Sequence, residues 1–243
     1  MASLEEEFQS VIENTKQYLV QQKDLFGNII YTEAKKEETI AEADIRFSLA
    51  DEPWTQSSTL DELNKNICHC LKCPLGGTRT KFVFGVGNPN ADLMFIGEAP
   101  GADEDAQGEP FVGRAGQLLN KIIEAVQMKR EEVFICNILK CRPPGNRDPQ
   151  PTEMETCTPY LSKQIELVKP KFIICLGRIS AQWLLQTNAT LTALRGKVHD
   201  YHGINLIVTY HPAALLRNPN WKYPAWDDMK MFKKLYDEMK AKS

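Results

Sequence analysis

The sequence has no long apolar run, and this absence excludes one class of protein. None of its apolar stretches approaches the roughly 20 residues needed to cross a bilayer, so we expect no membrane-spanning helix. The first ten residues, MASLEEEFQS, have neither the basic nor the apolar region of a secretory signal. The motifs G-x-x-x-x-G-K-[ST] and G-x-G-x-x-G are also missing, which argues against a nucleotide-binding protein built on a glycine-rich turn. We therefore expect a cytoplasmic protein of another kind.

Seven cysteines are present, and in a cytoplasmic protein they are more often free thiols or metal ligands than disulfides. Cys70 and Cys73 have the C-x-x-C spacing that suits either zinc or an iron–sulfur cluster. The usual second C-x-x-C is missing, because Cys141 and Cys157 are separated by 15 residues. Cys68 is ambiguous, either a bystander or a substitute ligand. The spacing indicates a metal site without choosing the metal.

The formal net charge of −3 conceals two unlike parts. Residues 1–66 carry 6 Lys or Arg and 14 Asp or Glu, whereas residues 67–243 carry 23 and 18. Residues 4–23 have the periodicity of an amphipathic helix, and the acidic stretch that follows indicates a linker. We therefore predict an acidic extension over 1–60 and a folded domain over 61–243. A mildly basic domain is compatible with nucleic-acid binding, but an ordinary mixed-charge surface explains it equally well.

Short apolar runs alternate with helical patterns through the predicted domain. This alternation predicts an α/β fold of three layers, with a central four-stranded parallel sheet between two layers of helices. No internal repeat or low-complexity tract interrupts it. Cys136 and Cys175 fall inside two of the strand runs, where a buried thiol acts as a small apolar side chain. The predicted strands are Leu93–Ile96, Val133–Ile138, Phe172–Leu176 and Leu206–Thr209, and the predicted helices cover 115–127, Thr152–Val168, Ile179–Leu185 and Asp227–Lys240.

Three distinctive loops, GEAPG, LKCRPP and YHPAALLRNP, follow three of these strands. In a parallel sheet they meet at one edge, the usual place for a ligand. Glycines let the backbone of the first loop approach a ligand closely, although such a turn can also be a plain connection. Glu98 and Glu104 are the carboxylates in that loop that we favour for positioning a water molecule. The alternative is a solvated acidic loop.

Three residues in these segments have side chains suited to a flat polar ligand. Phe111 could stack on a base or belong to the core. Asn137 offers one donor and one acceptor, which suits O4 and N3–H of a pyrimidine, although Asn is also a common turn residue. His211 precedes a proline that keeps it out of helical geometry, and at a strand end it can donate a hydrogen bond to a developing anion.

The segment after His211 contains two adjacent leucines and an arginine, Leu215, Leu216 and Arg217. Apolar side chains at a loop tip can wedge into a base stack, while arginine contacts phosphate. The alternative is that the leucines begin a buried helical turn.

Taken together, these segments resemble the family 4 uracil-DNA glycosylases, the type with a 4Fe-4S cluster. The match runs from about Cys70 to Pro219 and rests on CLKCPL, GEAPGADED, GEPFVGRAG, NILKCRPPGNRDP, the later Cys157 and YHPAALLRNP. Their order and spacing are far more specific than any single motif. The resemblance implies that a 4Fe-4S cluster is bound by Cys70, Cys73, Cys141 and Cys157, and that a uracil pocket is formed by Gly97, Glu98, Ala99, Phe111, Asn137 and His211.

The implied activity is hydrolysis of the N-glycosidic bond of a flipped-out deoxyuridine in single- or double-stranded DNA, as in base excision repair. No lysine is among the residues assigned to the pocket, so we expect an abasic site without strand cleavage. Some related families have a carboxylate near the position of Ala99, so its absence leaves the general base open between Glu98 and Glu104. We expect a monomer that meets a replication or repair partner through its extension. The rival function is a cluster-containing nucleic-acid-binding or redox-sensing protein without hydrolase activity.

Overall fold

The computed structural model describes residues 52–242, so the predicted helix over 4–23 and most of the predicted extension lie outside the described residues. The described part begins with the 3-10 helix η1 (Pro53–Gln56), whose Trp54 is buried with its ring 4.9 Å from that of Tyr160. Within this range, no helix is long and apolar enough to span a membrane.

The core of the fold is a six-stranded sheet in the order β1-β3-β2-β4-β6-β5. Its four central strands are parallel, as the apolar runs predict. The prediction of only four strands was incomplete, because an antiparallel strand lies at each edge. The strands are β1 (Val86–Gly87), β2 (Leu93–Gly97), β3 (Phe134–Asn137), β4 (Phe172–Leu176), β5 (Val198–Tyr201) and β6 (Ile204–Thr209).

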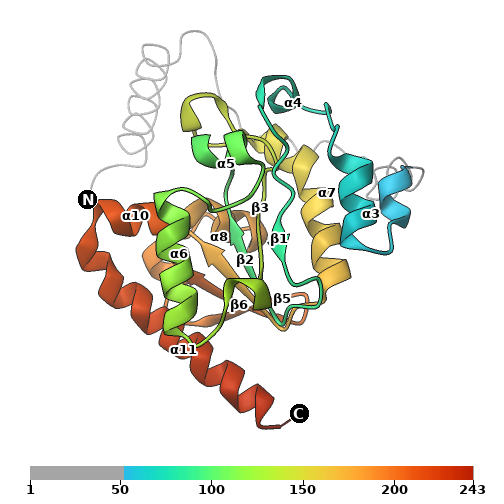
Figure 1. The fold of residues 1–243 in the computed structure, drawn as a ribbon. Coiled ribbons are helices and arrows are strands. Elements are labelled where there is room, and N and C mark those ends of the chain that lie inside the picture. Colours follow the sequence, from blue (N-terminus) through green and yellow to red (C-terminus); the bar gives the residue numbers. More distant parts are fainter. Residues whose placement is uncertain (1–51, 243) are drawn as a thin grey trace, which may run out of the picture. The chain divides into compact units, whose positions relative to one another are not determined.

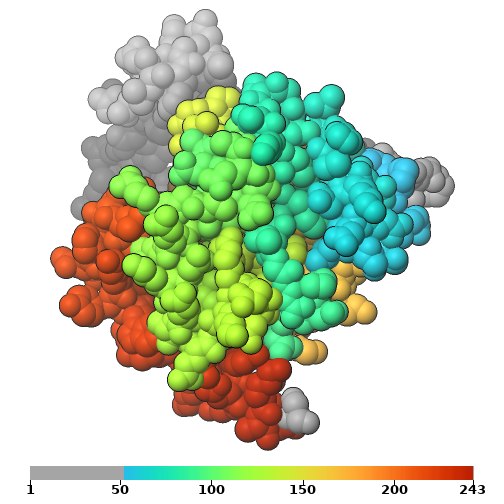
Figure 2. Space-filling view, in the orientation of Figure 1, coloured from blue at the N-terminus to red at the C-terminus, as the bar shows by residue number. Residues whose placement is uncertain are grey.

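Helices cover both faces of the sheet, which confirms the α/β class (Figure 1). On one face, α6 and α11 bury Leu119, Ile123, Met229 and Phe232 against the strands, and these two helices lie side by side at the surface (Figure 2). The helices are α3 (Leu60–Ile67), α4 (Leu75–Thr78), α5 (Ala102–Gln107), α6 (Arg114–Ala125), α7 (Pro151–Val168), α8 (Arg178–Leu184), α9 (Leu191–Leu194), α10 (Pro212–Arg217) and α11 (Lys222–Lys240), with 3-10 turns η2 (Arg130–Glu132), η3 (Pro144–Asn146) and η4 (Pro219–Trp221).

The carboxyl ends of the central strands place the distinctive loops together. The N–H groups of Ile138 and Leu139, just after β3, donate to the carbonyl oxygens of Gly97 and Glu98, each at a distance of 3.0 Å. The N–H of Gly177, after β4, donates to the carbonyl of Thr209, at the end of β6, over 2.9 Å. Backbone hydrogen bonds therefore continue past the strands and hold the loops in register.

Candidate active site

A cavity of about 360 Å³ opens at this edge of the sheet. It brings together residues that follow three different strands, and most of the residues predicted for the pocket line it. Arg217 at the end of α10 also borders it. The cavity is lined by Glu98, Ala99, Pro100, Gly101, Glu104, Phe111, Ala115, Asn137, Pro143, Asn146, Arg147, His211, Ala213 and Arg217.

Asn137 is the last residue of β3, and its side chain faces this cavity. The residue is 2 % exposed, yet its Oδ1 atom has no hydrogen-bond partner among the residues that the structure describes. A buried acceptor left unpaired costs about 1–3 kcal/mol. A ligand with an N–H group that reaches Oδ1 would recover this cost, so the orphaned amide oxygen indicates a binding site.

Gly97 ends β2 next to Asn137 and has no side chain to block the cavity. A Cβ atom at this position would lie 2.3 Å from Asn137 Oδ1 and 2.8 Å from Phe111 Cζ. Both distances are shorter than van der Waals contact, so any larger residue would displace these two side chains. Only glycine therefore fits at position 97 without displacing Asn137 or Phe111.

Phe111 combines burial with a strained backbone. It is 5 % exposed and has a φ of 54°, a region that bulky residues rarely adopt. Gly116 accommodates this turn, because a Cβ there would lie 1.8 Å from the Phe111 carbonyl oxygen. The phenyl ring lies 5.5 Å from the His211 ring and is tilted by 32°. Strain of this kind is typical of residues held in a functional orientation.

His211 precedes α10 and acts as its N-cap. Its Nδ1 atom accepts the N–H of Ala213 over 3.1 Å, so Nδ1 carries no proton and the proton of the neutral ring is on Nε2. Burial, together with the charge of Arg217, lowers the pKa of His211 to about 4, and Glu104 opposes the shift. At neutral pH the ring is an uncharged donor at the edge of the cavity.

Glu98 is an acidic residue whose pKa is shifted by its surroundings. Burial, together with the nearby charge of Asp148, raises its pKa to about 7, and Arg178 opposes the shift. The carboxylate is therefore close to half-ionised at neutral pH, which suits a general base.

Glu104 lies in the same loop but has its carboxylate already engaged. It accepts the N–H groups of Gly101, Val112 and Gly113 at 3.1, 3.0 and 3.2 Å. These bonds fix the loop that carries Phe111. The geometry therefore gives Glu104 a role in shaping the cavity and leaves Glu98 as the better candidate for contact with water.

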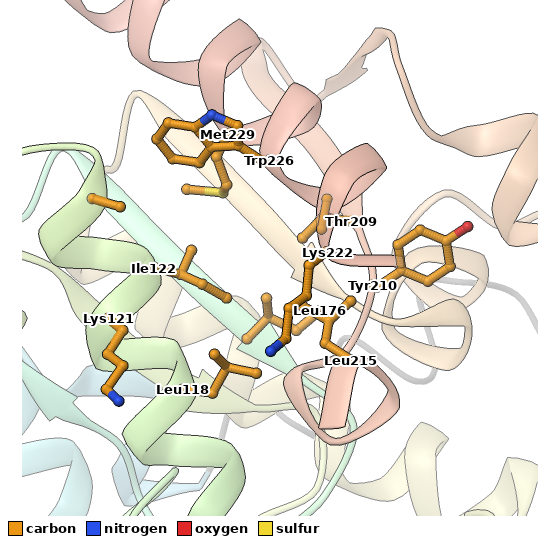
Figure 3. A pocket seen from close by; sticks show the side chains of 12 residues that line it. Leu118, Lys121, Ile122, Leu176, Thr209, Tyr210, Leu215, Lys222, Trp226 and Met229 are labelled. Carbon is orange, nitrogen blue, oxygen red and sulfur yellow. The ribbon is translucent and has the colours of Figure 1, made fainter. Parts of the chain in front are cut away.

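The segment predicted to touch DNA divides into two faces. Leu215 is 2 % exposed and lines a second, apolar cavity of about 200 Å³ between α6, α10 and α11 (Figure 3). Because Leu215 is buried, it cannot enter a base stack. The alternative prediction, that the leucines begin a buried helical turn, is correct for this residue. Leu216 is 43 % exposed, and Arg217 borders the active-site cavity.

Asn146 and Arg147 also line the cavity, although the motifs predicted no role for them. Both residues belong to the segment NILKCRPPGNRDP, one of the motifs on which the family resemblance rests, so this motif could have indicated their place in the site. Arg147 forms a two-bond ion pair with Glu153, at 2.9 and 2.6 Å, and thereby anchors its loop to the start of α7.

All seven cysteines are free thiols, and four of them are close enough to interact. Electrostatic interactions connect Cys141 with Cys70 and Cys73, and Cys157 with Cys141 and Cys73. Within residues 52–242, no group of three His, Cys, Asp or Glu residues is close enough to hold a single metal ion. Cys136 and Cys175 are buried in β3 and β4.

Two side chains donate hydrogen bonds to these sulfurs. Arg79 Nη1 lies 3.4 Å from Cys141 Sγ and 2.6 Å from the Cys70 carbonyl oxygen. Tyr160, one turn beyond Cys157 on α7, donates its hydroxyl to Cys70 Sγ over 3.3 Å. In contrast, the thiol of Cys68 lies 3.6 Å from the carbonyl oxygen of Lys65 in its own helix.

Comparison with known proteins agrees with the geometry of the site. Residues 84–240 match the model of the uracil DNA glycosylase superfamily. The chain is 44 % identical over 180 residues to the type-4 uracil-DNA glycosylase of Archaeoglobus fulgidus, covering 71 % of this chain and 90 % of that protein. It is 40 % identical over 167 residues to the type-4 enzyme of Thermotoga maritima, covering 68 % and 87 %.

A type-5 uracil-DNA glycosylase from Pyrobaculum aerophilum is more distant, at 29 % identity over 146 residues. The type-4 enzyme of the same organism is 44 % identical over 181 residues, with 92 % of its length covered. The six-stranded α/β architecture, the cavity at the strand ends and these identities agree: the chain belongs to the type-4 uracil-DNA glycosylases.

Proposed function

We propose that this chain removes uracil from DNA by hydrolysing the N-glycosidic bond of a flipped-out deoxyuridine, as the first step of base excision repair. The observation that supports this most strongly is the unpaired Oδ1 of Asn137, at the end of a cavity that also presents a neutral histidine donor. A cavity of about 360 Å³ has room for one pyrimidine base.

Recognition begins when the enzyme unstacks the nucleotide, which costs a few kcal/mol and least at a mismatch or in a single strand. The Phe111 ring stacks on the base. Asn137 Oδ1 accepts the N3–H of uracil, while its amide N–H donates to O4. Cytosine presents an acceptor and a donor at these two positions, so the same amide orientation excludes it.

Cleavage of the C–N bond leaves negative charge on the departing uracil and positive charge on the sugar. The Nε2–H of His211 donates to the uracil oxygen on which the charge develops, and this donor is already in place before the reaction. A preorganised donor of this kind lowers the barrier by about 3–4 kcal/mol. Glu98 positions a water molecule on the sugar side and accepts its proton.

The pH dependence of the reaction tests the role of Glu98. Its raised pKa of about 7 means that the carboxyl is protonated below neutral pH and cannot accept a proton. We expect single-turnover rates to fall about tenfold per pH unit below 7. His211 is already neutral throughout this range, because its pKa is about 4, and contributes no acidic limb above pH 5.

The control variant for this profile is Glu98→Gln, which keeps the shape of the side chain and removes its titration. Its rates should be low and nearly independent of pH between 5 and 8. Persistence of the wild-type acidic limb in Glu98→Gln would assign that limb to another group.

The products distinguish hydrolysis from attack by an amine. Among the described residues, no lysine lines the cavity. We expect free uracil and an alkali-labile abasic site, with no nick before alkali and no adduct trapped by borohydride. A trapped covalent adduct would show that an amine attacks the sugar, in contradiction to a hydrolytic mechanism.

A 4Fe-4S cluster fits the four converging thiols better than one metal ion does. Each thiolate of such a cluster binds a different iron, so the sulfurs lie further apart than the ligands of a single ion. We propose Cys70, Cys73, Cys141 and Cys157 as its ligands, with Arg79 and Tyr160 as the hydrogen-bond donors to the sulfurs. The cluster would serve to tie the segment before β1 to the loop after β3 and to α7.

The remaining proposals concern binding outside the pocket. Arg217 borders the cavity at the end of α10, and Leu216 beside it is exposed, so the apolar side chain can enter the base stack while arginine contacts phosphate. We propose residues 61–243 as the catalytic domain of a cytoplasmic monomer. The acidic residues 1–60 then serve as a segment for a replication or repair partner.

A further inference from the structure

Lys140 lies between the uracil pocket and the proposed cluster, and it is completely buried. Its Nζ atom donates to the carbonyl oxygen of Asn137 over 2.7 Å and to Gln164 Oε1 over 2.6 Å. The amide nitrogen of Gln164 donates in turn to the carbonyl oxygen of Phe84 over 2.9 Å. The ammonium therefore has a fixed position directly behind the end of β3.

Both of these acceptors are neutral. None of the ion pairs formed within residues 52–242 includes Lys140. A buried ammonium without a counter-charge is strongly destabilising. Burial lowers the pKa of Lys140, and the groups that oppose this shift are the thiols of Cys136, Cys141 and Cys157.

Two of those thiols, Cys141 and Cys157, belong to the proposed cluster. The backbone N–H of Lys140 also donates to the sulfur of Cys157. Four thiolates around a 4Fe-4S core give the whole group a net negative charge, and metal binding keeps the sulfurs deprotonated. A bound cluster thus supplies the negative charge that the buried ammonium lacks.

We propose that Lys140 is a positioning residue that couples the cluster to the uracil pocket. Its ammonium is the buried counter-charge of the cluster thiolates, and the same ammonium holds the carbonyl of Asn137. This inference rests on the function proposed above and deepens it. The cluster then supports uracil recognition through one lysine, in addition to joining segments of the chain.

The variant Lys140→Met tests this coupling, because methionine is similarly long and unbranched but carries no charge. The matched control is Lys197→Met, at an exposed lysine that does not line the cavity. Removal of a nearby positive charge makes a cluster harder to reduce. We expect the reduction potential of the Lys140→Met cluster to shift to more negative values, at equal iron content, while Lys197→Met matches wild type.

A second measurement concerns the pocket. Without the ammonium the carbonyl of Asn137 loses its donor, so the inhibition constant of free uracil should rise about tenfold, as for the loss of one strong hydrogen bond. DNA binding should not change. An unshifted potential would overturn the counter-charge role, and unchanged uracil inhibition would overturn the link to Asn137.

If Lys140→Met does not fold, Gln164→Glu decides the question. A carboxylate at this position neutralises the ammonium inside the protein, so the cluster potential should again become more negative. No shift would overturn the proposal. A wild-type protein without iron or uracil excision would instead refute the proposed function, which separates the two failures.

Discussion

Replacement of His211 by alanine should lower single-turnover uracil excision by about 10²–10³-fold, because one preorganised donor to a developing anion is lost. The hydrogen bond from Ala213 to Nδ1 fixes the neutral tautomer, and burial keeps the pKa of the ring near 4. The alanine variant retains the cavity and its charged border. Its affinity for uracil-containing DNA should therefore change little.

The measurement pairs single-turnover excision with equilibrium DNA binding. The control is His202→Asn, at an exposed histidine whose φ of 51° asparagine tolerates. This variant should behave as wild type in both assays. An equal loss of excision and DNA binding in His211→Ala would remove His211 from the chemical step.

Replacement of Asn137 by alanine should reduce uracil excision by about 10²-fold. Two hydrogen bonds to the base are lost, and each contributes about 1–1.5 kcal/mol. Because Oδ1 has no partner within residues 52–242, the variant breaks no bond there, and its thermal stability should stay close to that of wild type. The effect should appear in base recognition and leave folding intact.

Asn205→Ala is the matched control for this variant. Asn205 lies on β6, another of the four parallel strands, where it is exposed near the start of the strand. Excision by this control should be unchanged. Wild-type rates in Asn137→Ala under both steady-state and single-turnover conditions would refute its role in reading the base.

The sequence predicts the centre of the sheet and misses its edges for one physical reason. The four central strands are buried on both faces and therefore appear as apolar runs. The edge strand β1 has two residues, and β5 alternates between exposed and half-buried positions with Val198 39 % exposed, so neither has an apolar run to detect. The start of the last helix was also missed, because α11 begins at Lys222, five residues before the predicted start at Asp227.

The candidate site was easier to locate than to interpret. Loops after parallel strands meet at one edge, so the convergence of Glu98, Asn137 and His211 follows from strand order alone. Strand order does not tell which of the two carboxylates, Glu98 or Glu104, is free to contact water, because the hydrogen bonds that engage Glu104 form only when the loop folds. The burial of Leu215 and of Lys140 likewise depends on packing between elements distant in sequence.

The most direct test of the account is base release by the wild-type enzyme from three matched duplexes that differ at one position. With uracil, cytosine or thymine opposite guanine, single-turnover analysis should detect free uracil from the first duplex only. Asn137 excludes cytosine through its donor and acceptor. Thymine presents the same edge to Asn137 as uracil does, so its exclusion depends on the space beside its methyl group. Intact uracil-containing DNA, or equal release of cytosine, would contradict the account.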